Sequence, residues 1–317
     1  DKLLNNNFMV FTDAVRKDGY DLVVGDESWE VAEYLHYNPA LKTAPFVFMT
    51  DFVGASNVSQ DKKKQAHVYN FNGTFVEMRE VHPEVSDLSI FIGELDDLPD
   101  RPFGEGLPNI REWTKDRFKC SGYVLSFDPA DYSDRQALRK ELGFSAEDKV
   151  LLVAVGGTSV GRPLIEKCLE AQPTLKKKIP GIRTIVLSGP RIDPASFGPF
   201  EGVEFQPFIS DPIKHYAACD LAVIQGGLST AMELTALGRP FLYFPLKDHF
   251  EQQDHVVSRL KRHRAGVRMD FDNTTPSKLV EAIAANVGTT VDYRPVNTDG
   301  AKKAASMIME LLQKEKS

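Results

Sequence analysis

The chain has 317 residues, of which 42% are hydrophobic and 26% charged, with a formal net charge of −7. This length predicts two domains, because a single core rarely grows beyond about 250–300 residues. The acidic balance argues against a general nucleic-acid binder, which would present a basic face. No apolar run approaches the roughly 20 residues of a membrane span, and no signal-peptide pattern opens the sequence. Peripheral attachment to a membrane stays open.

The three cysteines, Cys120, Cys168 and Cys219, are odd in number and far apart, with no C-x-x-C spacing. This pattern excludes a zinc ribbon and argues against a disulfide scaffold. A reducing cytoplasm is therefore the expected location.

The N-terminal part reads as a βαβ unit, with a strand at 20–25, a helix at 28–37 and a strand at 45–49. Residues 52–120 are rich in Pro, Gly and Asp, and we expect a long excursion that is helical in part. The first segments read like the middle of a domain. We therefore expect residues 1–132 to form an incomplete N-terminal, acceptor-side Rossmann-like domain.

From residue 133 the pattern becomes regular and predicts a doubly wound α/β domain over 133–317. Strands are expected at 149–155, 183–187, 203–206, 220–224 and 240–244. Helices are expected at 133–142, 163–171, from 210, and at 229–237, 251–264, 275–286 and 300–314. The last helix is a candidate to pack back on the N-terminal domain.

Two glycine-rich turns follow strands of this domain, GGTSVG at 156–161 and QGGLST at 225–230. Each precedes a helix, whose free N–H groups and positive dipole end favour an anion. The alternative is that both are tight turns in which glycine serves backbone geometry. For either turn alone the two interpretations are equally favoured; for the pair, the anion site is favoured.

GGTSVG does not fit a common nucleotide-binding motif. The dinucleotide fingerprint requires glycine where Thr158 stands, and the P-loop lysine is missing. Thr230 and Glu233 have the spacing of a capping box. By spacing alone, this cap is favoured over a Glu233 that points into the crevice and accepts hydrogen bonds from sugar hydroxyls.

The block VEFQPFISDPIKHYAACDLAVIQGGLSTAMELTALGRPFLYFPLKDHFEQQDHV resembles the donor-binding half of GT-B glycosyltransferases. It is most similar to the bacterial muramoyl-pentapeptide N-acetylglucosaminyltransferase group and related UDP-glycosyltransferases. The resemblance covers residues 133–317 well and 20–50 loosely. It implies two Rossmann-like domains that face a cleft.

The resemblance also implies roles for particular residues. The backbone of Ile209 would read the uracil edge, and Glu233 would hold the ribose hydroxyls, which reverses the preference for a cap. The transferred sugar would be held by Gln252 and Gln253. The diphosphate would lie on the two turns, with Arg191 as a weaker phosphate candidate. The turn residues concerned are Gly156, Gly157, Thr158, Gly226, Gly227, Ser229 and Thr230.

The sequence departs from this family at Gln225, where many relatives carry histidine. His249 and His255 flank the glutamine pair and could replace the missing donor, although His255 is expected at the surface. In relatives the catalytic base comes from a first strand-loop that we do not expect in this sequence. Asp51 and Glu27 are weak substitutes for that base.

The resemblance therefore predicts an inverting glycosyltransferase that moves a sugar from a UDP-sugar to an unidentified hydroxyl acceptor, with dTDP left open as the nucleotide. No cofactor and no metal are expected, and Asp270-Phe271-Asp272 is interpreted as a loop rather than a metal-binding pair. Two alternatives stay open. One is a nucleotide-sugar 2-epimerase, and the other is a donor-binding subunit that needs a partner for activity.

Overall fold

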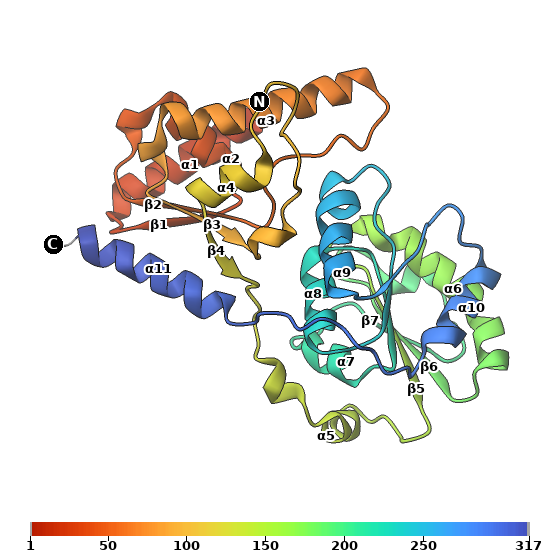
Figure 1. Cartoon of the computed structure of the whole chain (residues 1–317). Coiled ribbons are helices and arrows are strands. Elements are labelled where there is room, and N and C mark those ends of the chain that lie inside the picture. Colours follow the sequence, from red (N-terminus) through yellow and green to blue (C-terminus); the bar gives the residue numbers. More distant parts are fainter. Residues whose placement is uncertain (1, 316–317) are drawn as a thin grey trace. The chain divides into compact units, whose positions relative to one another are not determined.

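The chain forms two α/β units, each built on a parallel sheet (Figure 1). The structure is a computed structural model and describes residues 2–315. The first unit comprises Asp1–Ser126 and Asn297–Ser317, and the second comprises Phe127–Val296. The chain thus leaves the first unit after residue 126, forms the whole second unit, and returns to the first with its last helix.

The first unit has a four-stranded parallel sheet in the order β1-β2-β3-β4. Its strands are β1 (Val23–Asp26), β2 (Phe46–Thr50), β3 (Leu88–Ile92) and β4 (Lys119–Gly122). Its α-helices are α1 (Lys2–Asp18), α2 (Trp29–Tyr37), α3 (Lys62–Val81), α4 (Ile110–Arg117) and α11 (Gly300–Glu315). Short 3-10 turns lie at Pro39–Leu41, Pro83–Val85 and Leu95–Asp97.

Different helices cover the two faces of this sheet. Phe8 of α1, Phe75 of α3 and Trp113 of α4 share one core with Phe48 of β2. On the other face, Ala304 of α11 packs against β2 and β3. The strands are apolar because both faces are covered.

The segment 52–120 is helical in part, as expected, but it is not one long excursion, because it also contains β3 and the first residues of β4. Its longest helix, α3, contains a buried asparagine, Asn72. The side chain of Asn72 donates to the carbonyls of Ala55 (3.0 Å) and Phe103 (2.7 Å) and accepts from the N–H of Ala55 (2.7 Å). The buried face of α3 therefore includes a polar residue, and for this reason the hydrophobic periodicity of the α3 sequence is weak.

The second unit has a six-stranded parallel sheet in the order β10-β9-β8-β5-β6-β7. Its strands are β5 (Lys149–Ala154), β6 (Ile182–Leu187), β7 (Val203–Gln206), β8 (Leu221–Ile224), β9 (Phe241–Tyr243) and β10 (Val267–Arg268). Its α-helices are α5 (Arg135–Glu141), α6 (Arg162–Lys178), α7 (Pro212–Ala218), α8 (Leu228–Ala236), α9 (Val257–His263) and α10 (Pro276–Asn286). A π-helical turn, Glu251–Val256, precedes α9, and 3-10 turns lie at Pro129–Tyr132, Ser159–Gly161 and Pro194–Phe197.

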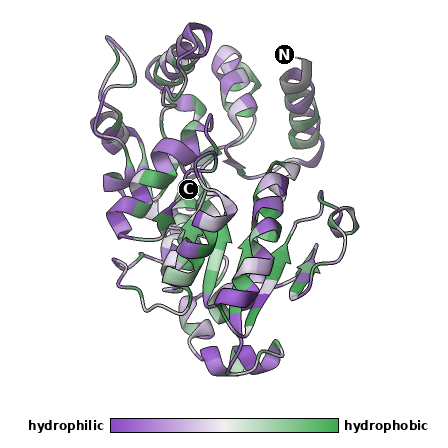
Figure 2. Cartoon of the chain, turned by 90° about the vertical axis from the view of Figure 1, so that its right-hand side faces the viewer, coloured by the Kyte–Doolittle hydropathy of each residue, from purple (hydrophilic) through white to green (hydrophobic). Residues whose placement is uncertain are grey.

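Helices cover both faces of this sheet, as in a doubly wound fold: α6 and α10 lie on one face and α7, α8 and α9 on the other (Figure 1). Figure 2 shows its strands as hydrophobic and the surrounding helices as largely hydrophilic. The core includes Leu151 and Val153 of β5, Ile165 of α6 and Ile283 of α10. The predicted doubly wound α/β architecture is confirmed.

Helix α6 is longer than predicted, and β10 was not predicted. A proline inside a helix removes one backbone hydrogen bond and usually ends or kinks it. Here α6 continues past Pro173, with Leu169, Ala171 and Leu175 all buried against the core. Strand β10 has only two residues, too few to give a periodic signal.

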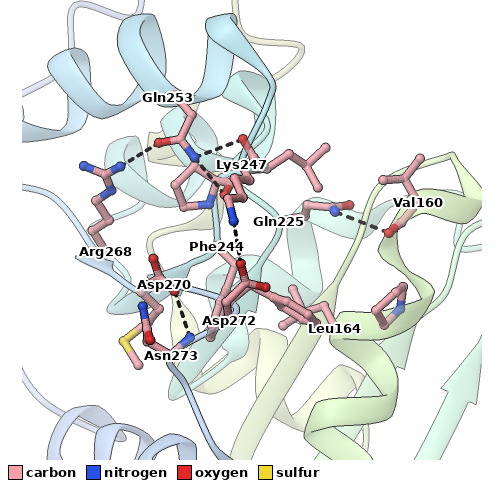
Figure 3. Close-up of a pocket in the computed structure, with 15 residues that line it drawn as sticks. Val160, Leu164, Gln225, Phe244, Lys247, Gln253, Arg268, Asp270, Asp272 and Asn273 are labelled. Atoms are coloured by element: carbon pink, nitrogen blue, oxygen red, sulfur yellow. Dashed lines mark hydrogen bonds and ion pairs between the residues drawn. The ribbon is translucent and has the colours of Figure 1, made fainter. Parts of the chain in front are cut away.

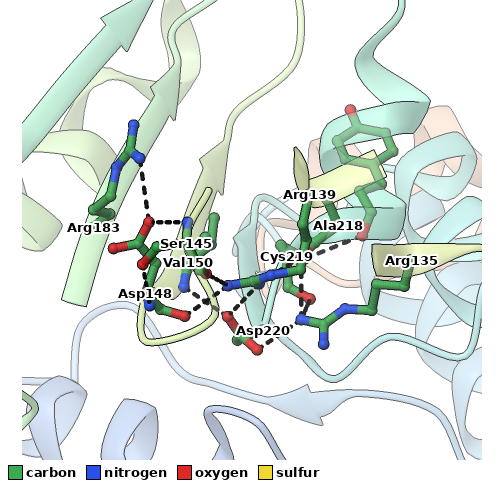
Figure 4. A network of polar contacts seen from close by, with 10 residues as sticks. Arg135, Arg139, Ser145, Asp148, Val150, Arg183, Ala218, Cys219 and Asp220 are labelled. Carbon is green, nitrogen blue, oxygen red and sulfur yellow. Dashed lines mark hydrogen bonds and ion pairs between the residues drawn. The ribbon is translucent and has the colours of Figure 1, made fainter. Parts of the chain in front are cut away.

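A buried ion-pair network fixes the start of β8 (Figure 4). The carboxylate of Asp220 accepts hydrogen bonds from Arg135 (2.6 Å), Arg139 (3.0 Å) and the backbone N–H of Val150 (2.7 Å). Burial alone would raise the pKa of Asp220, but the Val150 N–H and the Arg135 guanidinium outweigh it and hold that pKa below its usual value. The network ties α5 to β5 and β8, the strands whose opposite ends carry the two glycine turns.

Among the described residues, no helix combines the length and the hydropathy that crossing a membrane would require.

Candidate functional site

A pocket of about 350 Å³ lies where β5 and β8 end, and we call it the β5–β8 pocket. From β5 the chain winds outward to β6 and β7, then returns to β8 and winds the other way to β9 and β10. Ligands of open parallel sheets bind at such a switch point, beyond the carboxyl ends of the strands. The pocket is lined by Ala154, Val155, Gly156, Gly157, Thr158, Val160, Ile224, Gln225, Gly227, Thr230, Leu246, His249 and Gln252.

The first glycine turn forms one wall of this pocket. Gly156 has φ +76°, a conformation that favours glycine. Its carbonyl packs so closely on Gly189 that a Cβ on Gly189 would lie 2.3 Å from the oxygen. Gly157 has no left-handed φ, and a Cβ there would meet nothing within 4 Å. The chain itself therefore requires glycine at 156 but not at 157.

In the second glycine turn, too, the backbone requires glycine at the first position but not at the second. Gly226 has φ +38°, and a Cβ there would lie 2.9 Å from Cα of Pro245. Gly227 is the N-cap of α8, with φ −71° and ψ 142°, and a Cβ there would meet nothing within 4 Å. The first N–H groups of a helix have no intrahelical acceptor. Gly227 thus leaves room beside the positive end of α8.

The capping box that spacing alone favoured at Thr230 and Glu233 does not form. The cap is Gly227, so Thr230 lies inside the first turn of α8. Glu233 is three residues further along the same helix face. Its pKa is raised to about 7 by burial. Within residues 2–315 this carboxyl group does not cap α8, and Glu233 does not line the β5–β8 pocket.

Tyr216 of α7 stands beside these residues and was missed from sequence. Burial raises the pKa of its phenol to about 12, the charge of Glu233 adds to the effect, and a hydrogen bond with the Thr230 side chain opposes it. Tyr216 lies far from the glycine turn in sequence, and no motif marked it.

His249 brings a titratable group to the β5–β8 pocket. Its backbone N–H donates to the carbonyl of Leu246 (3.2 Å), and its Nδ1 is buried with no hydrogen-bond partner in the part of the chain that is described. Burial lowers the pKa of this imidazole below 6.5. The free protein therefore presents a neutral ring there at pH 7.

The two consecutive glutamines point to different places. Gln252 lines the β5–β8 pocket, and its Oε1 accepts from the N–H of Leu246 (2.9 Å). Gln253 donates from Nε2 to the carbonyls of Pro245 (3.2 Å) and Leu246 (2.9 Å), and its Oε1 accepts from Arg268 (2.6 Å). Both belong to the π-helical turn, and such turns are frequent at functional sites.

Gln253 faces a second pocket of about 590 Å³, which we call the β9–β10 pocket (Figure 3). It shares Val160, Gln225 and Leu246 with the β5–β8 pocket. Its other lining residues are Pro163, Leu164, Phe244, Pro245, Lys247, Gln253, Arg268, Met269, Asp270, Phe271, Asp272 and Asn273. The segment Asp270-Phe271-Asp272 is a loop after β10, as predicted.

Some predicted donor-site residues do not line either pocket. Arg191 follows β6 and Ile209 follows β7, so both lie at the same edge of the sheet as the pockets. Ser229 is exposed in the first turn of α8. His255 was expected at the surface, and this is wrong, because only 1% of it is exposed.

Asp51 and Glu27 belong to the first unit, where they follow the neighbouring strands β2 and β1. The Oε1 atom of Glu27 accepts from Thr50 Oγ1 (3.2 Å) and from the N–H of Asp51 (3.4 Å). Glu27 has φ 51°, a left-handed conformation that is uncommon outside glycine. The Glu27 carboxylate therefore lies against the backbone of Asp51 at the carboxyl edge of the first sheet.

Residues 150–312, more than half of the chain, match the glycosyltransferase family 28 C-terminal domain. An uncharacterized glycosyltransferase of Methanosarcina mazei is 35% identical over 133 residues, which are 42% of this chain and 34% of that protein. The chain thus matches about a third of the length of this relative.

A second relative is a UDP-N-acetylglucosamine–N-acetylmuramyl-(pentapeptide) pyrophosphoryl-undecaprenol N-acetylglucosamine transferase of Acidiphilium cryptum. It is 37% identical over 76 residues, or 24% of this chain and 20% of that protein. The crystal structure of MurG from Acinetobacter baumannii is similar with a TM-score of 0.54 and 15% identity, over 98% of this chain and 78% of that one. This likeness shows the fold, which is that of GT-B proteins.

Proposed function

Because the chain belongs to the family of the glycosyltransferase family 28 C-terminal domain, we propose that it moves a sugar from a nucleoside-diphosphate donor to an acceptor hydroxyl. The observation that carries this proposal is the β5–β8 pocket, where two glycine turns leave open space beside backbone N–H groups. The relative from Acidiphilium cryptum is named for a UDP-sugar donor, which supports UDP as the nucleotide.

The diphosphate of the donor would lie in the β5–β8 pocket, against Gly157, Gly227 and the first N–H groups of α8. Such amides are already aimed at the charge that develops on the leaving group, so they stabilise it without reorganisation. Among the residues that the structure describes, no lysine or arginine lines this pocket. Charge stabilisation would therefore rest on the backbone, on the hydroxyls of Thr158 and Thr230, and on His249, and no metal is needed.

The nucleoside would lie on the β6–β7 side, with the backbone of Ile209 at the base, Glu233 at the ribose hydroxyls and Arg191 near a phosphate. Gln252, whose Nε2 has no partner among residues 2–315, would donate to the donor sugar. The amide donors of Gln253 are both used, which removes it from this role.

In the proposed reaction the acceptor oxygen attacks the anomeric carbon as the bond to the diphosphate oxygen breaks, and a base takes the acceptor proton. This direct displacement inverts the configuration at that carbon.

The experiment that tests the function is calorimetric binding of UDP and dTDP, followed by incubation with UDP-N-acetylglucosamine and alcohol acceptors. Proton NMR of the product would report the anomeric configuration. Inverted glycoside supports the proposal. Retained configuration contradicts the displacement, and a 2-epimerised UDP-sugar without glycoside contradicts transfer.

Replacing Gly227 by alanine is expected to weaken UDP binding at least about tenfold, because the new methyl group occupies the space that the diphosphate needs. The same change should not destabilise the protein, since φ −71° and ψ 142° suit any residue and no atom lies within 4 Å of the new Cβ. At compatible positions Gly→Ala stabilises by about 0.4–1 kcal/mol, but an N-cap prefers glycine to alanine, so the net change in the free energy of unfolding should be small. Calorimetry and urea unfolding measure the two effects.

Gly73 in α3 offers a matched control, because a Cβ there also meets nothing within 4 Å. Gly73→Ala should leave UDP affinity unchanged. Equal UDP affinity in Gly227→Ala and wild type would show that no ligand approaches this turn.

Donor affinity is expected to increase as pH falls from 8 to 6. Burial lowers the pKa of His249, and a diphosphate beside it would raise that pKa, so binding takes up a proton. A rise of one unit corresponds to about a tenfold gain in affinity. UDP-glucose is the probe, because its diphosphate does not titrate near neutrality. His249→Gln should flatten the pH profile, and a slope that survives in this variant would exclude His249 as its source.

A further inference from the structure

A small cavity of about 10 Å³ lies between α2, the end of α3 and the residues that lead into β3, and we call it the α2–α3 cavity. Its polar lining residues are His36, Arg79, His82 and Ser86. A cavity of this volume holds one particle of the size of a water molecule or a monatomic ion. It belongs to the amino-terminal edge of the first sheet, because Ser86 directly precedes β3. It is therefore separate from the pockets of the second unit and from the carboxyl edge of its own sheet.

Arg79 brings a positive charge to this cavity without a partner of opposite sign. Its guanidinium carbon lies 4.7, 4.1 and 5.1 Å from the ring centroids of Phe48, Phe75 and Phe118. These rings attract the cation, but Nε and Nη2 are buried and have no hydrogen-bond partner among residues 2–315. Burial alone lowers the pKa of Arg79 to about 9, so the group is still charged at pH 7. Buried charges in proteins are normally paired, and this one is not.

His36 of α2 adds a second unsatisfied group to the same cavity. It is 7% exposed, and its Nδ1 has no hydrogen-bond partner in the described part of the chain. Burial lowers the pKa of this imidazole, and His82, whose ring centroid is 5.2 Å away, lowers it further. Glu77 of α3, the backbone of Met78 and Glu33 of α2 act in the opposite sense without reversing the shift. The ring is therefore neutral at pH 7, and only its protonated form has a donor at Nδ1.

The charges around the α2–α3 cavity favour an anion. Among the described residues, no aspartate or glutamate lines it. Glu84 lies nearby in the chain, but it is exposed and already accepts from Nδ1 of His82 (2.9 Å). A metal cation would be repelled by Arg79, and no group of three or more potential metal ligands is found within residues 2–315. The volume of the cavity suits a halide rather than a phosphate or a carboxylate.

We propose that the α2–α3 cavity binds a monatomic anion such as chloride between the guanidinium of Arg79 and the imidazole of His36. The anion supplies the negative charge that the buried arginine lacks, and it accepts a hydrogen bond from Nδ1 of His36 when that ring is protonated. Binding ties α2 to the end of α3 and becomes stronger as pH falls. This site does not depend on the proposed transfer reaction.

The first test is urea unfolding of the full chain in sodium chloride and in sodium gluconate of equal ionic strength, at pH 6 and pH 8. Gluconate is too large for the cavity, and equal ionic strength keeps the screening of surface charges the same. We expect chloride to raise the unfolding midpoint above that in gluconate, because a ligand of the folded state stabilises it. If the anion raises the pKa of His36 by one unit, chloride affinity increases by up to about tenfold as pH falls.

Two variants locate the effect. Arg79→Met removes the charge but keeps a long apolar side chain, and it should abolish the difference between the two salts. Arg16→Met, at an exposed position of α1, removes a charge of the same sign and is the matched control. It should leave the difference between the salts intact. A chloride response in Arg79→Met that equals the response of the wild type would show that the ion does not bind beside Arg79.

A second measurement keeps the test independent of Arg79→Met, because that variant also loses contacts with three phenylalanine rings. NMR of the wild type follows the His36 ring through a pH titration in each salt, with His36→Gln to identify its signal. Chloride should raise the pKa of His36 by about one unit, which is the tenfold change in affinity expressed as a titration. The exposed ring of His67 is the internal control and should respond equally in both salts. An equal titration of His36 in both salts, or a shift with zinc but not with chloride, would overturn the proposal.

Discussion

Glu233→Gln is expected to weaken UDP binding about 10- to 100-fold and, at the same time, to stabilise the free protein at alkaline pH. Hydrogen bonds to a charged group contribute about 1.5–3 kcal/mol, and the neutral amide would lose this part of the contact with the ribose hydroxyls. Calorimetry with UDP at pH 8 measures the first effect. An unchanged affinity would show that Glu233 does not touch the ribose.

The stability effect follows from the same burial. The pKa of Glu233 is about 7 in the folded chain and 4.5 when the group is free in water, so the folded state holds its proton more tightly. The free energy of unfolding therefore falls as pH rises between these two values, by up to about 3 kcal/mol. Glutamine does not titrate, so the variant should gain over the wild type at pH 8 but hardly at pH 5.

Urea unfolding at the two pH values measures this gain. Glu170→Gln, at an exposed position of α6, is the control and should show no such difference. If Glu233→Gln both stabilises the free protein at pH 8 and weakens UDP binding, the ionised carboxylate of Glu233 serves ligand binding and not the stability of the fold. Equal pH dependence in Glu233→Gln and wild type would contradict the raised pKa.

Asp220→Ala is expected to lower the free energy of unfolding by about 3–5 kcal/mol, because it leaves the buried guanidinium of Arg139 without its carboxylate. The N–H of Val150 loses its acceptor as well. The expected loss is large because both groups are withdrawn from water. Urea unfolding at pH 7 measures it.

The pH dependence of this contribution has the opposite sign to that of Glu233. The pKa of Asp220 is depressed in the folded protein, so its stabilisation is present above the usual pKa of 3.8 and is lost as pH falls through the lower folded value. Glu166→Ala breaks the exposed pair with Arg162 and should cost at most about 0.5 kcal/mol. A loss in Asp220→Ala no larger than in this control would refute the structural role of the network.

Five of the six strands of the second unit could be predicted because a sheet covered on both faces gives continuous apolar runs, as at Leu221–Ile224. The first unit was harder. Helix α3 contains lysines, a glycine and the buried Asn72, whose partners lie far away in the sequence. A helix whose buried face includes polar residues gives no clear period.

The candidate site could be predicted from the sequence where a residue type in a given position has a single common structural role. Glycine before a helix at the end of a strand is such a signal, and the glycine turns do form the β5–β8 pocket. Local spacing failed for Thr230 and Glu233, because the helix begins earlier, at Leu228. It also could not separate Gln252 from Gln253, since their directions depend on the π-helical turn and on Arg268. Such contacts are tertiary and leave no local pattern.

The most direct test of this account is a crystal structure of the protein with UDP. We predict the diphosphate in the β5–β8 pocket, with its oxygens accepting hydrogen bonds from the backbone N–H groups around Gly157 and Gly227 and the ribose hydroxyls near Glu233. UDP bound elsewhere on the chain, or a diphosphate turned away from both glycine turns, would contradict the assignment.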